Sequence, residues 1–173
     1  MYSEKLYNFA NNDIIETENH RKGWEVRNME KIPVKKLKPN AILPTYGSEE
    51  AAGADLYACL DAPVEIAPGK TVFIPTGLAM EIPRGFAGLA YARSGLAWKK
   101  DLAPANKVGV IDSDYRGEFI IALHNHGSEA CVIEHGERIA QLVITPVFTP
   151  GFTEVSELSD TKRGAGGFGS TGK

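Results

Sequence analysis

One run of ten residues carries most of the groups that could do acid–base chemistry. It reads Gly-Val-Ile-Asp-Ser-Asp-Tyr-Arg-Gly-Glu over residues 109–118, an apolar strand that runs into a turn with two acids and an aromatic ring. A carboxylate held on such a turn, beside a ring that can stack, could activate water next to a planar ligand. Asp residues also satisfy the amides of ordinary hairpin turns, so the segment alone leaves both interpretations open.

Two further segments carry groups that suit a phosphate. Arg93, Ser94 and Gly95 lie between a predicted strand and a short predicted helix, where a guanidinium fork, a hydroxyl and a helix N-terminus can contact an anion. Near the C-terminus, five of the nine residues 164–172 are glycine, with hydroxyl residues and Arg163 nearby. Glycine exposes backbone N–H groups that bind phosphate, although the same composition also fits a flexible tail. The run matches a dinucleotide-binding glycine pattern, but no helix can follow it, which excludes that fold.

These segments need a scaffold, and the pattern from Ile32 onward predicts β-structure. Short runs rich in Val, Ile, Phe and Thr are separated by Gly, Pro and Asn. Many short strands with almost no helix favour an antiparallel sandwich or barrel, because a parallel sheet needs crossover helices. The one helix expected covers residues 95–100. The expected strands cover residues 64–66, 71–74, 77–82, 86–91, 118–123, 130–134 and 139–148.

Length and composition bound the class of protein. The chain has 173 residues, 43% hydrophobic and 24% charged, which fits one globular domain. Its formal charge of −3 argues against a nucleic-acid or membrane partner. Cys59 and Cys131 form no CxxC pair, so neither a disulfide framework nor a thiolate zinc site is expected. No apolar run approaches the roughly 18 residues of a membrane span and no secretory signal is recognisable, so we expect a cytoplasmic protein.

Three regions follow one another along the chain. Residues 1–31 mix both charges with scattered apolar positions and are expected to be an extension that is partly helical or disordered. Residues 32–159 form the expected β-domain. Residues 160–173 form the glycine-rich tail, which has high chain entropy and little capacity to build a core.

Taken together, five segments resemble the motifs of the trimeric dUTPase (dUTP diphosphatase) family, in the family's order and spacing. The resemblance implies an all-β, jelly-roll-like β-barrel that assembles as a homotrimer, with active sites shared between subunits. It also implies that the C-terminal tail closes over the bound nucleotide. The matching segments are residues 52–56, 92–97, 106–118, 136–142 and 163–172.

The resemblance implies hydrolysis of dUTP to dUMP and diphosphate, which keeps uracil out of DNA and supplies dUMP for dTMP synthesis. Asp112 matches the general base that activates the water attacking the α-phosphorus. Tyr115 matches the aromatic residue that packs on the deoxyribose and leaves no room for a 2′-hydroxyl. Asn106 and the backbone around Val110 and Ile111 match the segment that reads the uracil edge.

The phosphates are implied to contact other motifs. Arg93, Ser94 and Gly95 match the family's phosphate loop, and Gln141 matches a glutamine of the same region. The matching tail residues are Arg163, Phe168, Gly169, Ser170 and Thr171, with Phe168 stacking over uracil. Mg²⁺ is held mainly by the triphosphate in this family, and Asp55 matches the carboxylate that holds it through water. Arg138 is expected to be structural and ion-paired near the barrel.

Two other functions remain open from the sequence. A dCTP deaminase shares the fold, but it would need a cytosine site and a Glu placed for deamination, whereas this chain keeps the uracil-type segment. A binding or regulatory protein on the same scaffold is the second alternative, with the N-terminal extension as a partner-binding arm. Release of ammonia from dCTP, or loss of function on deleting residues 1–28, would indicate one or the other.

Overall fold

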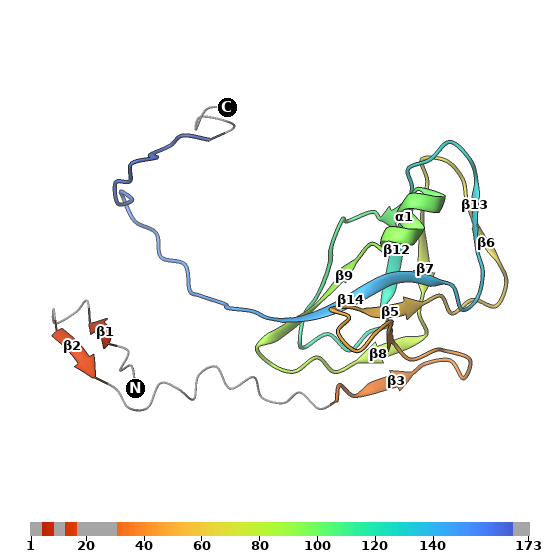
Figure 1. Cartoon of the computed structure of the whole chain (residues 1–173), viewed down its shortest axis with the longest axis horizontal. Helices are drawn as coiled ribbons and strands as arrows, with labels where there is room; N and C mark the ends of the chain where they lie inside the picture. The colour runs from red at the N-terminus through yellow and green to blue at the C-terminus, as the bar shows by residue number, and fades with distance from the viewer. Residues whose placement is uncertain (1–4, 9–12, 17–30, 168–173) are drawn as a thin grey trace.

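The computed structural model describes residues 5–8, 13–16 and 31–167, and Figure 1 shows a β-rich body with one short helix. Helix α1 (Ser94–Lys100) confirms the helix expected over residues 95–100. The strands are β1 (Lys5–Asn8), β2 (Asp13–Glu16), β3 (Val34–Lys36), β4 (Thr45–Tyr46), β5 (Ala54–Tyr57), β6 (Val64–Ile66), β7 (Thr71–Pro75), β8 (Leu78–Met80), β9 (Phe86–Tyr91), β10 (Leu102–Pro104), β11 (Gly109–Ile111), β12 (Ile120–Asn125), β13 (Cys131–Ile133) and β14 (Arg138–Pro146).

The strands form a jelly-roll-like arrangement in which every described pair is antiparallel. One sheet has five strands in the order β11-β9-β14-β5-β4, and a second has three in the order β10-β12-β7. The remaining described pairs are β13-β6, β3-β8 and β1-β2. The all-β expectation is confirmed. Because β14 pairs with β5 on one side and β9 on the other, it brings motifs that are far apart in the sequence side by side.

A single apolar core joins the sheets. Leu56 of β5, Leu142 of β14, Ile74 of β7 and Leu123 of β12 belong to one buried cluster, and each is at most 4% exposed. Burying side chains of this size stabilises the fold by about 1.5–3 kcal/mol each relative to exposure. The core therefore fixes both larger sheets, and with them the loops that leave their ends.

One buried polar side chain ties the sheets together without leaving a group unsatisfied. Asn125 donates through Nδ2 to the carbonyl oxygens of Ile66 and Glu129, at 2.8 Å each. Its Oδ1 accepts from the backbone N–H of Gly127 at 2.9 Å. A buried amide with all these partners costs little to bury, whereas one left unpaired would cost about 1–3 kcal/mol.

The predicted strands differ from the observed ones mainly at their ends. Strands over residues 64–66 and 86–91 have the expected bounds, and each of the other expected strands differs by one or two residues at one or both ends. Strands β3, β4, β5 and β10 were not predicted. They have only two to four residues, and β5 and β10 contain Asp55 and Pro104, which are unfavourable in strands on propensity alone.

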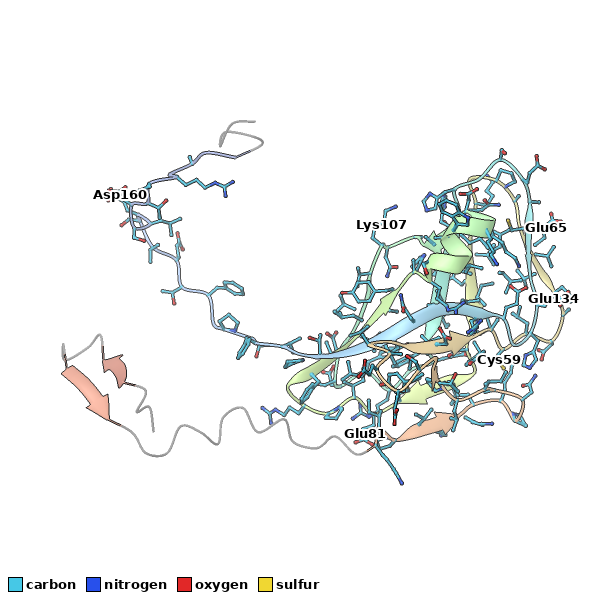
Figure 2. All side chains as sticks on the ribbon, viewed as in Figure 1. Cys59, Glu65, Glu81, Lys107, Glu134 and Asp160 are labelled. Atoms are coloured by element: carbon cyan, nitrogen blue, oxygen red, sulfur yellow. The ribbon has the colours of Figure 1, made fainter. Side chains whose placement is uncertain are left out.

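The two terminal regions differ in what the structure describes. In the N-terminal extension, the described segments are strands β1 and β2 where a helix or disorder was expected. Leu-Tyr and Ile-Ile pairs in these segments favour strands over helix. After β14, residues 147–167 have no helix or strand and leave the barrel, and Figure 2 shows Asp160 well outside it. In the part of the chain described, no helix is long and apolar enough to cross a membrane.

Candidate active site

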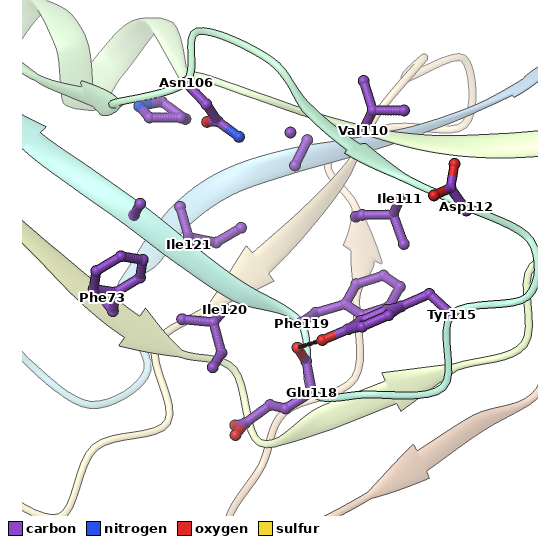
Figure 3. Close-up of a pocket in the computed structure, with 14 residues that line it drawn as sticks. Phe73, Asn106, Val110, Ile111, Asp112, Tyr115, Glu118, Phe119, Ile120 and Ile121 are labelled. Carbon is purple, nitrogen blue, oxygen red and sulfur yellow. Dashed lines mark hydrogen bonds between the residues drawn. The ribbon is translucent and has the colours of Figure 1, made fainter.

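A hollow of about 390 Å³ opens beside strand β11 and is called here the hairpin pocket (Figure 3). Its other walls come from β7, β9, β10, β12 and the loop before β12. The core holds all these elements, so the pocket has a rigid frame. The predicted site residues that line it are Asn106, Val110, Ile111, Asp112 and Tyr115.

Strand β11 leaves one edge of its backbone free toward the pocket side of the sheet. It pairs with β9 through Gly109↔Ala90, Val110↔Leu89 and Ile111↔Gly88, and it is the end strand of the five-stranded sheet. An end strand keeps N–H and C=O groups that no neighbouring strand satisfies. Fixed backbone donors and acceptors therefore lie along one wall of the pocket.

A tight turn places Asn106 at the start of this wall. Lys107 has φ 65°, in the left-handed region, and its N–H donates to the carbonyl of Pro104 at 3.0 Å. The N–H of Val108 donates to the carbonyl of Asn106 at 2.7 Å. The turn connects β10 to β11, so the Asn106 side chain lies at the mouth of the same hollow that Val110 and Ile111 line.

A second turn carries Asp112 and Tyr115. The N–H of Tyr115 donates to the carbonyl of Asp112 at 3.2 Å, which closes the turn. Arg116 braces it by donating from one guanidinium nitrogen to the carbonyl oxygens of Ser113 and Tyr115, at 2.7 and 3.0 Å. Asp112 is exposed and forms no ion pair with a described residue. Its carboxylate is therefore available to accept a proton at the rim of the pocket.

The ring of Tyr115 is held from several sides. Its hydroxyl donates to the carbonyl of Glu118 at 2.9 Å, drawn as a dashed line in Figure 3. Its centroid lies 6.2 Å from that of Phe119, with the two planes at 32°. Phe119 is only 2% exposed, so it is a fixed support. The Tyr115 side chain itself remains open to a ligand, because Tyr115 is 44% exposed.

A different group forms around Asp55 of β5 and is called here the Asp55 cluster. Arg93 donates from Nε to the Asp55 carboxylate at 2.6 Å, and Arg138 donates to the other carboxylate oxygen at 3.2 Å. The Asp55 side chain is 12% exposed, and two guanidinium groups offset the loss of its hydration. Arg138 is ion-paired, as expected. The sequence did not indicate that its partner is Asp55.

Gln141 of β14 completes the Asp55 cluster. In the sheet it lies opposite Asp55 of β5 and opposite Tyr91 of β9. Its Nε2 donates to the carbonyl of Ala92 at 2.8 Å, directly before Arg93. Ser94 and Gly95 follow as the first residues of α1, and both are exposed. The residues predicted to contact phosphate in the barrel are therefore gathered at one place.

A second hollow, of about 430 Å³, opens next to the Asp55 cluster. Its cationic side chains are Arg93, Lys100 and Arg138. Lys100 is paired with Glu137, with its Nζ at 3.0 and 3.1 Å from the two carboxylate oxygens. The hollow therefore has a modest positive excess, suited to an anion that brings cations of its own.

The described chain brings the predicted residues into two groups, not one. The hairpin pocket and the second hollow have no lining residue in common. Arg163 of the tail lies in neither group, and its Nε donates to the carbonyl of Gly166 at 2.8 Å. Phe168, Gly169, Ser170 and Thr171 lie outside the described residues.

The donor set decides what kind of metal site is possible. Among the described residues, no group of three or more His, Cys, Asp or Glu side chains could hold a metal ion. Asp55 stands alone, and both of its oxygens already accept from an arginine. A carboxylate oxygen has a second lone pair, so Asp55 can still accept from a water molecule. This set fits a metal that brings most of its ligands with a substrate.

Some residues at the site were not found from the sequence. Phe119 and Ile120 line the hairpin pocket and directly follow the motif that supplies the polar groups, whereas Phe73 comes from β7, far from that motif in the sequence. Only the pairing of β12 with β7, in which Ala122 lies opposite Phe73, brings Phe73 there. A pattern of short apolar runs predicts the strands but not which strands pair.

The family model for dUTPase matches residues 39–172 of the chain. A deoxyuridine 5′-triphosphate nucleotidohydrolase of Desulfitobacterium hafniense is 56% identical over 131 residues, 75% of this chain and 87% of that protein. The same enzyme of Nautilia profundicola is 52% identical over 143 residues, 83% of this chain and 99% of its own. Among solved structures, the Staphylococcus bacteriophage 80alpha dUTPase with dUPNHPP has a TM-score of 0.76 and 32% identity, covering 83% and 99% of the two chains.

Proposed function

The chain belongs to the dUTPase family of enzymes, which hydrolyse a diphosphate bond of dUTP, and from this premise we propose how its residues carry out the reaction. Water attacks the α-phosphorus, and dUMP and diphosphate leave. The observation that carries the proposal is one pocket lined by a fixed backbone edge, an exposed carboxylate and a supported aromatic ring. These groups can read a base, accept a proton and contact a sugar, respectively.

Asp112 is the proposed general base. It is exposed at the rim of the hairpin pocket, and no described cation occupies its carboxylate. The carboxylate would take the proton of a water molecule as that water attacks phosphorus. General-base catalysis of this kind contributes a factor of about 100 to 10,000 to the rate. The closed turn fixes the backbone position of Asp112 at the pocket rim.

Uracil is the proposed base, read by the free edge of β11 together with Asn106. Backbone N–H and C=O groups pair with the base edge and reject cytosine, because its exocyclic amine reverses the donor and acceptor pattern. A close fit against Val110 and Ile111 would leave no space for the methyl group of thymine. Support comes from the position of β11 at the end of its sheet.

Tyr115 is proposed to pack against the deoxyribose. A ring that is held by Glu118 and Phe119 cannot move aside for an added 2′-hydroxyl, so UTP would be excluded. A rigid wall can exclude a substrate by a steric clash when that substrate is the larger one, as UTP is compared with dUTP.

The triphosphate is proposed to lie on the Asp55 cluster side, contacted by Arg93, Ser94, Gly95 and Gln141. A Cβ built on Gly95 meets nothing within 4 Å, so a ligand can approach its backbone closely. Arg163 and Phe168 to Thr171 of the tail would close over the nucleotide and exclude other water.

Mg²⁺ is proposed to enter with the triphosphate, and when bound it would offset the phosphate charge. Asp55 would hold a water molecule of that metal rather than the metal itself. Arg93 and Arg138 keep the carboxylate oriented for this. The absence of a cluster of three ligand side chains among the described residues is consistent with a metal carried by the substrate.

We propose that the site is completed by a second subunit in a homotrimer. The polar groups that would read the nucleoside and those that would contact phosphate line different hollows of one chain. The pocket wall also exposes large apolar side chains, with Phe73 at 72%, Val110 at 66% and Ile120 at 48%. Exposed apolar surface of this kind commonly marks an interface, and a closed ring repeats a shared site at each contact.

Within the cell, such an enzyme would keep uracil out of DNA and supply dUMP for dTMP synthesis, and we propose the cytoplasm as its place. The decisive experiment measures diphosphate release from dUTP, UTP, dTTP and dCTP, with Mg²⁺ and with excess EDTA. Release from dUTP alone, lost with EDTA, is expected. Ammonia release from dCTP would overturn the proposal in favour of a deaminase. No release from any nucleotide by folded protein would favour a binding scaffold.

A further inference from the structure

The glycine two residues after Tyr115 lies in an unusual position. A Cβ built on Gly117 would lie 2.5 Å from Cζ and 2.9 Å from Cε2 of the Tyr115 ring, and would also overlap its hydroxyl oxygen. Ordinary van der Waals contact begins at 3.4 Å. The ring of Tyr115 therefore lies directly across the backbone of Gly117, in space that every other residue type would fill.

The backbone of Gly117 does not itself require glycine. Among the described residues, the glycines with positive φ are Gly69, Gly77, Gly85, Gly136 and Gly164, and Gly117 is not one of them. A positive φ is therefore not the reason for glycine at position 117. The reason that the structure gives is the ring of Tyr115, which lies where a Cβ would be.

The ring cannot yield easily to an added methyl group. Its hydroxyl is anchored on the Glu118 carbonyl at 2.9 Å, and its face is supported by Phe119. Tyrosine has only two side-chain torsions, so moving Cζ away by about 1 Å shifts the whole ring and breaks or bends the anchoring hydrogen bond. A displacement of about 1 Å at a substrate-positioning group can cost about 100-fold in rate.

We propose that Gly117 is a specificity-determining positioning residue, which sets the depth of the sugar subsite by letting the Tyr115 ring lie back against the turn. This inference rests on the proposed contact between Tyr115 and the deoxyribose. Gly117 touches no substrate; it acts through Tyr115. With alanine there, the ring would stand forward into the hairpin pocket, in the volume that the deoxyribose would occupy.

The test compares Gly117→Ala with the parent enzyme on dUTP and UTP. We expect KM for dUTP to rise and kcat/KM for dUTP to fall about 10- to 100-fold. The dUTP-to-UTP ratio of kcat/KM should rise, because a shallower sugar subsite penalises the larger ribose of UTP more. A merely structural defect would lower the folded fraction, and so kcat, with KM unchanged. Gly47→Ala is the matched control, because a Cβ on Gly47 meets nothing within 4 Å and its activity should match the parent.

A second background separates the ring from the turn. In Tyr115→Ala, where no ring remains, adding Gly117→Ala should change kcat/KM by less than about twofold, since contacting residues show such non-additivity. An equal loss in both backgrounds, or no loss in either, would overturn the inference. Failure of the proposed function looks different: Tyr115→Ala alone would then leave the preference for dUTP over UTP unchanged.

Discussion

Two inactive variants of this chain are expected to restore activity when they assemble together. Asp112→Asn removes the proposed base from the hairpin pocket, and Arg93→Gln removes a proposed phosphate contact from the Asp55 cluster. The two residues line hollows that have no residue in common. Arg93→Gln leaves a side-chain N–H that can still donate to Asp55, and Arg138 still pairs with Asp55. Neither variant should therefore unfold the barrel.

The magnitude follows from how a shared site is assembled. Suppose that each site takes its hairpin pocket from one chain and its Asp55 cluster from a neighbour. When equal amounts of the two variants mix at random, the hairpin pocket of a site is intact with a chance of one in two, and so is its Asp55 cluster. About one quarter of the sites are then complete, whatever the size of a closed ring. If one chain supplied both halves, no mixed site would be complete.

The assay is diphosphate release from dUTP after the two variants are co-refolded, compared with each variant refolded alone. About one quarter of parental activity is expected from the mixture. The matched control mixes parent enzyme with the double variant Asp112→Asn/Arg93→Gln, which should again give about one quarter for shared sites but about one half for sites within one chain. Zero for the first mixture together with one half for the second would refute the shared site.

Four other perturbations test separate parts of the reasoning. Asp112→Asn alone should lower kcat about 100- to 10,000-fold while the midpoint of denaturant unfolding stays unchanged, because Asp112 is exposed and unpaired among described residues; near-parental turnover would exclude it as the base. Removing residues 163–173 should leave the assembly intact by light scattering but slow hydrolysis strongly, and an unchanged rate would show that the tail does not close the site. Asp55→Asn should lower the free energy of unfolding by about 2 kcal/mol in denaturant titrations, because it removes the charged acceptor of two guanidiniums, one of them half-exposed; a change under about 0.5 kcal/mol would contradict the ion-pair geometry. Burial raises the pKa of the Cys59 thiol, which leaves less of the reactive thiolate. Iodoacetamide at pH 8 should therefore label Cys59 only after unfolding. Label on Cys59 of the native protein, detected by mass spectrometry, would contradict its burial.

Local residue patterns predicted the barrel well where each strand carries its own signal. Strand β9 and the pair β6-β13 are rich in apolar residues and have Gly or Pro within a few residues of their ends, and their positions were predicted to within one residue. Helix α1 was also predicted, and its residues include no β-branched side chain and end in two lysines. Both signals act over a few residues, which is the range that sequence patterning resolves.

Strand β5 shows why the rest escaped prediction. Its residues Ala54 to Leu56 are all buried, so no alternation of buried and exposed residues marks it as a strand. Its Asp55 is stable there only because Arg93 and Arg138, which are 38 and 83 residues away, supply positive charge. The charges that stabilise Asp55 within β5 come together only after the sheet has formed, so no local sequence pattern can predict this strand.

Two glycines of the site, Gly109 and Gly117, also differ in a way that only the folded structure shows, which is the space available for a Cβ atom. The segment 109–118 has two glycines, and the sequence gives no reason to treat them differently. A Cβ on Gly109 would come within 3.3 Å of Ala90 across the sheet, a tight contact that a small shift relieves. A Cβ on Gly117 would overlap an anchored ring. Only the second substitution is expected to change specificity.

The charges around the second hollow explain why a chain with a formal charge of −3 can bind a triphosphate. Arg93, Lys100 and Arg138 bring three positive charges there, and Asp55 and Glu137 cancel two of them. A single excess charge cannot balance the roughly four negative charges of a nucleoside triphosphate. The balance requires cations from outside the barrel, which are the proposed Mg²⁺ and Arg163 of the tail. A barrel with a stronger positive field would bind nucleic acid and free polyphosphates as well, whereas under the proposed mechanism this arrangement is expected to bind tightly only when substrate, metal and tail meet.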